Sequence, residues 1–152
     1  MHLPHYLGLL DHSEKQITKA FEQVARHHHD EPDIEQMCQK LSAWSREHRG
    51  KLVPFLQRYF ETSSSEPARL KQQLLAPPRH GALGLIRDLH DLWLLTQEVQ
   101  LCWTVIHQAT LALRDEELKA TCEFCSSRTK RQTDWLLGRI KQAAPQTLVV
   151  AD

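Results

Sequence analysis

Two polar residues interrupt apolar helix patterns in a way that could support chemistry. Glu14 stands between Leu10 and Ile17 on the apolar side of one expected helix, and His48 breaks the apolar side of the next. A carboxyl group inside a protein core must find a cation, a hydrogen-bond donor or a metal ion, because burying it without a partner is costly. Reflecting the chain about an expected turn near residue 31 places His48 opposite Glu14. The sequence therefore predicts that these two side chains meet in the core.

Further polar residues fall at similar heights in the other expected helices. Each occupies a position that the helical pattern assigns to the core. If the second and third helices run parallel from similar starting heights, His48 is level with about residue 97. The expected polar layer then contains Glu14, Ser45, His48, Thr96, Thr129 and Gln132.

This arrangement resembles the ferritin-like di-iron carboxylate proteins, which place one Glu on each of two helices and a Glu-x-x-His on each of the other two. The resemblance covers roughly residues 4–144, mainly as architecture. Glu14 matches the first-helix carboxylate, and His48 matches the second-helix histidine. The remaining four ligand positions hold Ser45, Thr96, Thr129 and Gln132.

The resemblance implies an iron or manganese site, but hydroxyl and amide groups bind these metals weakly and neutralise no cation charge. We therefore expect a hydrogen-bonded network around Glu14 and His48 that holds no metal or one weakly bound ion. Such a protein would act through interaction or structure and would not be an enzyme. The alternative is an oxidase or metal-handling protein, with Glu98, Glu123 or Asp91 turned inward to complete the ligand set.

A second candidate metal site is the Cys122-x-x-Cys125 pair on the apolar side of the fourth expected helix. The two thiols lie about one helical turn apart and could hold zinc or copper together with Cys102 or His107. Cysteine is also a common small core residue, so one such pair is a weak indication of metal binding. We keep thiol-based metal binding as a second alternative.

The other motifs favour structural roles. The run His27–His29 closes the first expected helix, where imidazolium is favoured by the helix dipole, so we expect capping rather than metal binding. The chain has neither a glycine-rich phosphate loop nor a nucleophile elbow, which argues against nucleotide binding and hydrolysis. Packing or an interface is the expected role of Trp44, Trp93, Trp103 and Trp135.

Four long helices must position these residues. Glycine is scarce and apolar residues recur every three or four positions, which is typical of an all-α domain. Pro4 lies in the expected first turn of the first helix, and Asp33 is the expected N-cap of the second. The helices are expected at about residues 4–29, 33–59, 82–113 and 118–143. We also expect a short linker helix within 62–81 and an extended tail over 145–152, because Pro145 interrupts helical hydrogen bonding.

The lengths of the connections predict how these helices are joined. Short turns link the first helix to the second and the third to the fourth, so each pair should form an antiparallel hairpin. The connection between the hairpins has about twenty residues, enough to cross the length of a bundle. We therefore predict a four-helix bundle with a long crossover between helices two and three, the connectivity of ferritin-like folds. The alternative is an alternating up-and-down bundle in which the loop between the second and third helices carries additional structure.

Composition limits the partners and the compartment. The 152 residues fit a single domain, and 19 basic and 19 acidic side chains leave no charge excess to attract nucleic acid or anionic lipid. Neither a membrane-spanning apolar run nor a signal peptide is expected, and four cysteines do not suggest a disulfide framework. We expect a cytoplasmic protein.

The wide apolar surface of the third helix, including Trp93, further predicts a homodimer.

Overall fold

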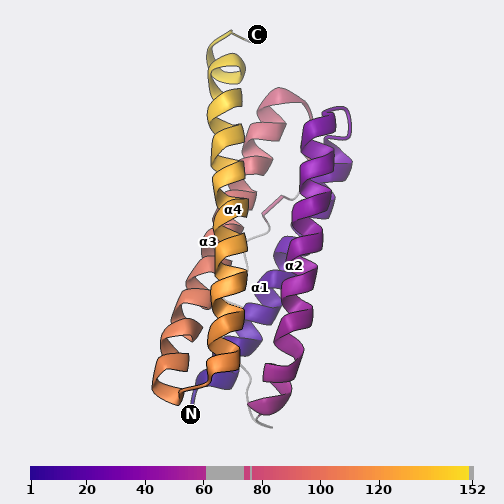
Figure 1. The fold of residues 1–152 in the computed structure, drawn as a ribbon. Coiled ribbons are helices and arrows are strands. Elements are labelled where there is room, and N and C mark those ends of the chain that lie inside the picture. Colours follow the sequence, from indigo (N-terminus) through magenta and orange to yellow (C-terminus); the bar gives the residue numbers. More distant parts are fainter. Residues whose placement is uncertain (61–73, 76, 151–152) are drawn as a thin grey trace.

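A computed structural model describes residues 1–60, 74–75 and 77–150. Four long α-helices pack side by side as a bundle (Figure 1), which confirms the predicted all-α architecture. The elements are α1 (Leu3–His27), α2 (Pro32–Arg58), α3 (Gly81–Leu113), α4 (Glu116–Pro145) and the π-helical turn η1 (Gln146–Val150). The linker helix expected within 62–81 falls largely on residues 61–73 and 76, outside the described part of the chain.

Local sequence signals account for most helix ends. Proline lies in the first turn of both α1 and α2, where its missing N–H costs nothing. Arg114 adopts a left-handed conformation that ends α3, and the Asp115 side chain then accepts a hydrogen bond from the Leu118 N–H to cap α4. The expected N-cap of α2 was wrong by two residues. Glu31 occupies that position, and Asp33 lies in the first turn, where its carboxylate still complements the helix dipole.

The ends of the helices establish their directions. His28, after α1, contacts Asp88 near the start of α3, so these two helices run antiparallel. Arg58 at the end of α2 contacts Asp115 at the start of α4, so this pair is antiparallel as well. With α1 and α2 also antiparallel, α2 and α3 run in the same direction (Figure 1). The predicted crossover between the two hairpins is confirmed.

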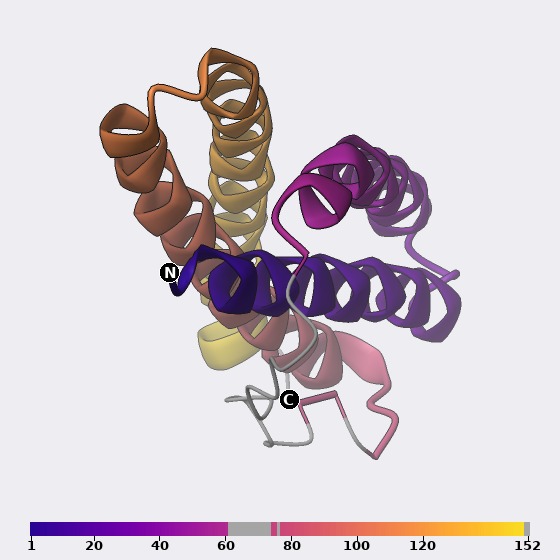
Figure 2. The ribbon, with the colours of Figure 1, turned by 90° about the horizontal axis from the view of Figure 1, so that it is seen from below.

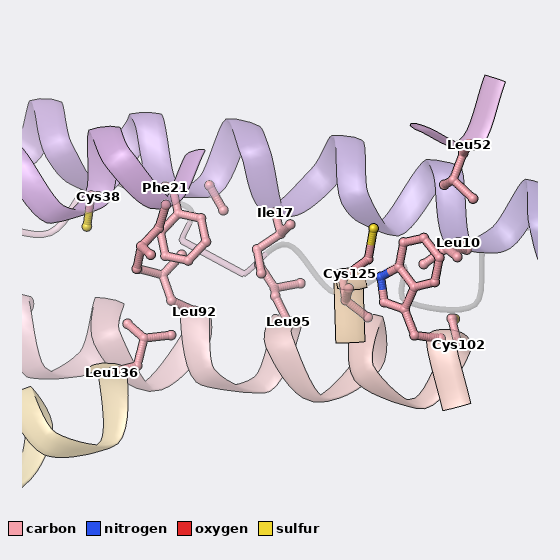
Figure 3. Packing of buried hydrophobic residues seen from close by; sticks show 14 of the residues in the cluster. Leu10, Ile17, Phe21, Cys38, Leu52, Leu92, Leu95, Cys102, Cys125 and Leu136 are labelled. Carbon is pink, nitrogen blue, oxygen red and sulfur yellow. The ribbon is translucent and has the colours of Figure 1, made fainter. Parts of the chain in front are cut away.

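Figure 2 shows the α1–α2 hairpin beside the α3–α4 hairpin, and all four helices contribute buried side chains to one hydrophobic core. From α1, Phe21 and Ile17 point toward Leu92 and Leu95 of α3 (Figure 3). All four side chains are buried, as their three- and four-residue spacing predicts. This apolar contact holds the two hairpins together.

The contacts between neighbouring helices are unequal. Within each hairpin the helices pack closely along their length, and α1 also packs extensively on α3. Contact between α2 and α4 is the sparsest of the four neighbouring pairs. The α2–α4 side of the bundle is therefore its least tightly packed side.

The end of the chain is helical rather than extended, so the predicted tail was wrong. Helix α4 continues to Pro145, and η1 adds a π-helical turn that packs against α4 and α3. Pro145 has no N–H and therefore removes one hydrogen bond from the last turn of α4 without ending the helical course of the chain. Leu148, Val149 and Val150 remain exposed on this turn. None of the helices in the described residues is long and apolar enough to cross a membrane.

Candidate functional site

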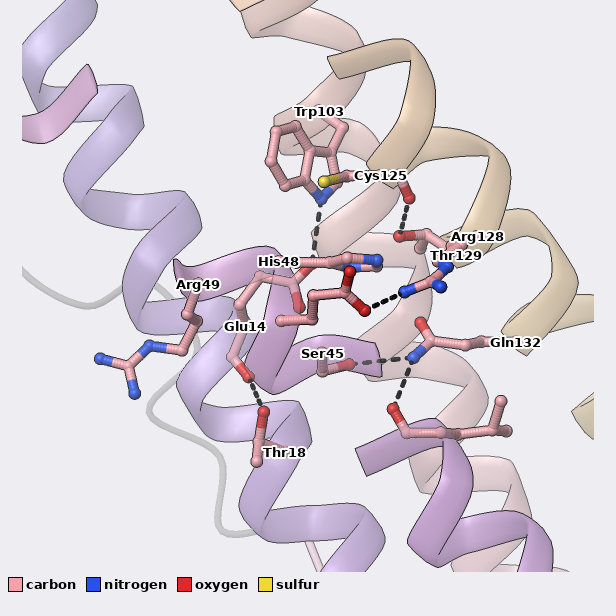
Figure 4. A network of polar contacts seen from close by, with 12 residues as sticks. Glu14, Thr18, Ser45, His48, Arg49, Trp103, Cys125, Arg128, Thr129 and Gln132 are labelled. Carbon is pink, nitrogen blue, oxygen red and sulfur yellow. Dashed lines mark hydrogen bonds and ion pairs between the residues drawn. The ribbon is translucent and has the colours of Figure 1, made fainter. Parts of the chain in front are cut away.

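Glu14 and His48 meet in the bundle core, as the sequence predicted. Both side chains are completely buried, and His48 Nδ1 lies 3.2 Å from Glu14 Oε1. The Trp103 indole N–H from α3 donates to the same carboxyl oxygen at 2.9 Å (Figure 4). The bond from Trp103 shows that Oε1 acts as a hydrogen-bond acceptor. We therefore assign a proton to His48 Nδ1, which donates to the same oxygen. Three helices thus converge on one carboxyl group.

Sequence reasoning missed Trp103 because it placed α3 at the wrong height. The pairs His28–Asp88 and Glu14–Trp103 show that Glu14 is level with residue 103 of α3, not with residue 96. The helix begins farther along the bundle than assumed, beyond the level where α2 begins. A signal was nevertheless present, because a tryptophan on an apolar stripe needs a partner for its buried N–H group.

The predicted single polar layer is therefore divided. Thr96 lies seven residues from Trp103, about two helical turns away, and its hydroxyl donates to the Trp93 carbonyl on its own helix. Thr129 likewise donates to the Cys125 carbonyl at 2.8 Å. Both residues are completely buried, as predicted, but their hydroxyls satisfy hydrogen bonds within their own helices. Neither is bonded to Glu14 or His48.

Ser45 and Gln132 form a second buried contact next to the first. The Gln132 amide donates to the Ser45 hydroxyl at 2.9 Å and to the Leu41 carbonyl at 3.0 Å (Figure 4). This amide joins α4 to α2 one turn away from His48. Gln132 thus cross-links two helices at a position where the resemblance implied a metal ligand.

Two atoms of the central network have no hydrogen-bond partner among the described residues. They are Glu14 Oε2 and His48 Nε2, and both are buried. They are the two atoms of this network that could ligate an ion. One carboxyl group and one imidazole fall short of the several carboxylates that a two-metal centre needs. Within the described residues no group of three or more His, Cys, Asp or Glu side chains could hold a metal ion.

The other acidic candidates lie elsewhere. Asp91 is buried, but it accepts hydrogen bonds from Arg79 and from the Leu75 N–H. Glu123 is exposed and contacts His107 at 3.3 Å. Glu98 is half-buried on α3. The structure thus gives Asp91 and Glu123 other partners and does not assemble these carboxylates around Glu14.

The two cysteines of the Cys-x-x-Cys pair lie in different surroundings. Cys125 lies beside Trp103 (Figure 4), where burial, and next the nearby Glu14, raise its thiol pKa. Cys122 lines a hollow of about 400 Å³ between α3 and α4, together with His107 and Glu123. Burial is also the main cause that raises the pKa of Cys122, to about 12. Both groups are thiols near neutral pH, whereas a metal ligand must be a thiolate.

His48 also connects the core to the α2–α4 side of the molecule. Its ring meets Trp103 edge to face on one side, with centroids 6.2 Å apart, and Phe124 on the other, with centroids 6.4 Å apart. Phe124 is 40% exposed. The buried His48 ring is therefore in direct contact with a partly exposed aromatic ring.

A second buried polar network joins α1, α3 and the connection that precedes α3. His28 Nε2 lies 2.8 Å from Asp88, and Arg79 donates to Asp88 at 3.0 Å and to Asp91 at 2.7 Å. His28 thus pairs with a carboxylate across the bundle, whereas the expected role was helix capping. The pattern offered one clue, because His28 continues the apolar stripe of α1.

Comparison with protein-family models, curated proteins and solved structures gives no significant match for this chain.

Proposed function

We propose that this chain is a divergent ferritin-like bundle in which a hydrogen-bonded network replaces the metal centre, and that it works through protein interaction or as a structural element rather than by catalysis. One observation carries the proposal. Trp103 and His48 both engage the oxygen Oε1 of Glu14, the one carboxyl group kept at an expected ligand position. A carboxyl group held by an indole and an imidazole acts as a link between three helices.

The surrounding groups support the same conclusion. Ser45 and Gln132 bind each other, and the hydroxyls of Thr96 and Thr129 bind carbonyl groups of their own helices. None of these four groups carries the negative charge that would balance two metal cations. The parallel α2 and α3, joined by a long connection, agree with ferritin-like connectivity.

A metal titration tests the proposal. Protein purified without added metal should contain less than about one equivalent of iron or manganese, and anaerobic titration should not reveal two tightly bound irons per chain, because the charged donor set is too small. Elemental analysis and the titration curve measure both quantities. Two tightly bound irons per chain would refute the proposal.

A single bound iron or manganese ion is the alternative that the geometry favours next. The observation behind it is that Glu14 Oε2 and His48 Nε2 are buried without partners among the described residues. In the same titration this alternative predicts one ion per chain, whose binding His48→Gln abolishes. Thiol-based binding of zinc or copper would instead be abolished by replacing Cys122 and Cys125 with serine. Burial favours the protonated form of both thiols, so this second alternative has less support.

We further propose that the interaction includes a second copy of this chain, bound through the outer side of α3. Over residues 92–113 Glu98 is the sole Asp, Glu, Lys or Arg residue. Leu94 and Leu101, seven residues apart on one side of the helix, are 39% and 59% exposed. A surface that is almost free of charge can pair with its own copy without bringing like charges together. These properties support a homodimer.

Light scattering at micromolar concentration tests the homodimer. The native chain should have twice the monomer mass. The double variant Leu94→Glu/Leu101→Glu should be monomeric, because it would bring four carboxylates into the contact. Val53→Glu, which changes an exposed apolar residue of α2, is the matched control and should remain dimeric. A monomeric native protein would contradict the proposal.

A further inference from the structure

The sparse contact between α2 and α4 is bridged on its outer side by alternating cations and aromatic rings. We call this surface the α2–α4 face, and it consists of Lys40, Trp44, Lys51, Phe124, Arg128 and Arg131. Helix α2 supplies the first three residues and α4 supplies the last three. The face lies outside the buried network on which the proposed function rests.

Each ring of this face is in contact with more than one cation. The Trp44 ring has Arg131 at 4.8 Å, Arg128 at 4.9 Å and Lys40 at 5.5 Å from its centroid. The Phe124 ring has Lys51 and Arg128, both at 4.7 Å. Cation–π attraction therefore favours conformations that keep four positive charges close together.

The positive charge of this face is only partly balanced. Glu47 pairs with Arg128, and this hydrogen bond is the main cause that lowers the pKa of Glu47. Lys40, Lys51 and Arg131 are exposed and form no ion pair in the part of the chain that the structure describes, although Lys51 also helps to lower the pKa of Glu47. Asp134, three residues after Arg131, pairs with Lys130 at 2.7 Å. Four cations thus share one surface with a single carboxylate, Glu47, in a chain whose formal net charge is zero.

The ends of the same side carry the opposite charge. At each end two carboxylates share one arginine, which leaves one negative charge in excess. Asp33 and Glu31 share Arg139 at one end, and Asp115 and Glu117 share Arg58 at the other. The positive stretch between them is short. Lys40 and Lys51 are eleven residues apart on α2, which corresponds to about 16 Å along the helix. A long polyanion would run into carboxylates at both ends, whereas about five extended residues span the positive stretch.

We propose that the α2–α4 face is a docking site for a short acidic segment of another protein. Its carboxylates would pair with Lys40, Lys51 and Arg131, and its apolar atoms would cover the exposed edge of Phe124. Tryptophan and arginine are the residue types that contribute most strongly to protein–protein binding, and here they are already held in place by each other. Charge complementarity thus identifies both the occupant and its length.

A peptide of six glutamates, capped at both ends and carrying a fluorescent label, is a direct probe. Binding to the full chain at low salt, followed by fluorescence anisotropy, should be saturable and should weaken as salt is added. The double variant Lys51→Glu/Arg131→Glu should bind at least about tenfold more weakly, because two attractive charges become repulsive. The double variant Lys15→Glu/Lys19→Glu, which changes two exposed lysines of α1 by the same total charge, should bind within about twofold of the native chain.

Each other outcome would overturn the proposal. Equal weakening in the two double variants would show an effect of net charge alone, and no binding of the peptide would show that the face does not attract carboxylates. Tighter binding of a six-nucleotide DNA strand than of the peptide would make the face a nucleic-acid site instead. Circular dichroism establishes that each variant is folded, and Lys51→Gln/Arg131→Gln replaces the charge-reversed pair if that variant is not.

Discussion

At the scale of single residues, two tryptophans of α3 differ in what their indole N–H groups meet. The N–H of Trp103 donates to Glu14, whereas the buried Nε1 of Trp93 has no hydrogen-bond partner among the described residues. The two side chains are ten residues apart on the same helix. They form a matched pair for measuring what the buried hydrogen bond contributes to stability.

We expect Trp103→Phe to lower the free energy of unfolding by about 1–3 kcal/mol more than Trp93→Phe does. Trp103→Phe leaves the buried Glu14 carboxyl with one donor fewer, and losing a partner exposes the full cost of desolvating a polar group. Trp93→Phe removes an N–H that has no partner to lose. Urea unfolding followed by circular dichroism measures both values. Equal losses would mean that the Trp103–Glu14 bond contributes nothing beyond packing.

At the scale of elements, Asp115 joins the end of α2 to the start of α4. Its carboxylate accepts hydrogen bonds from Tyr59 at 2.6 Å, from Arg58 at 2.8 Å and from the Leu118 N–H at 3.0 Å. Burial by itself would raise the pKa of Asp115, but these three donors outweigh burial and hold the pKa below its ordinary value of 3.8. The folded protein therefore favours the ionised carboxylate more strongly than the unfolded chain does.

This preference predicts how stability depends on pH. A lowered pKa in the folded state contributes stability that is present above about pH 4 and is lost as the pH falls through the folded pKa. We expect Asp115→Asn to lower the free energy of unfolding by about 1–2 kcal/mol at pH 7, with a smaller loss near pH 2. Asparagine still caps a helix, so the change tests the charge and not the cap. Urea unfolding at both pH values measures the difference.

Glu116→Gln is the control for this experiment. Glu116 is the next residue along the chain, and its exposed side chain lies 4.0 Å from Lys119. An exposed ion pair of this kind contributes little to stability, so the change should have a small effect at both pH values. An equally large, pH-dependent loss in Glu116→Gln would assign the effect to the charge at the helix start in general.

At the scale of the whole molecule, the sequence predicted best the features that short connections determine. The helical spacing of apolar residues and the tight turn after His28 were enough to predict that Glu14 meets His48. The short turn at Arg114–Asp115 likewise predicted the second hairpin. In both cases a turn of only a few residues joins the two helices, so the turn leaves little freedom in their relative height.

The relative height of the two hairpins could not be predicted in the same way. A connection of about twenty residues does not determine where α3 begins relative to α2, and the resulting error of several residues replaced Trp103 by Thr96 in the expected layer. The contacts of Arg79 were hidden for the same reason, because this residue lies in the connection and contacts Asp88 and Asp91 of α3. Sequence pattern defined the individual hairpins, and contacts between them define how they fit together.

The unequal helix contacts have a consequence for the motion of the molecule. Buried leucines, isoleucine and phenylalanine join α1 to α3, whereas α2 and α4 are joined by the buried hydrogen bonds of Gln132 and by charged and aromatic groups at the surface. Salt weakens the charged surface contacts between α2 and α4 and leaves the apolar contact between α1 and α3 intact. Local opening should therefore begin at the α2–α4 edge, with α1 and α3 acting as the hinge, and water would first reach the unpaired edge of His48 past Phe124.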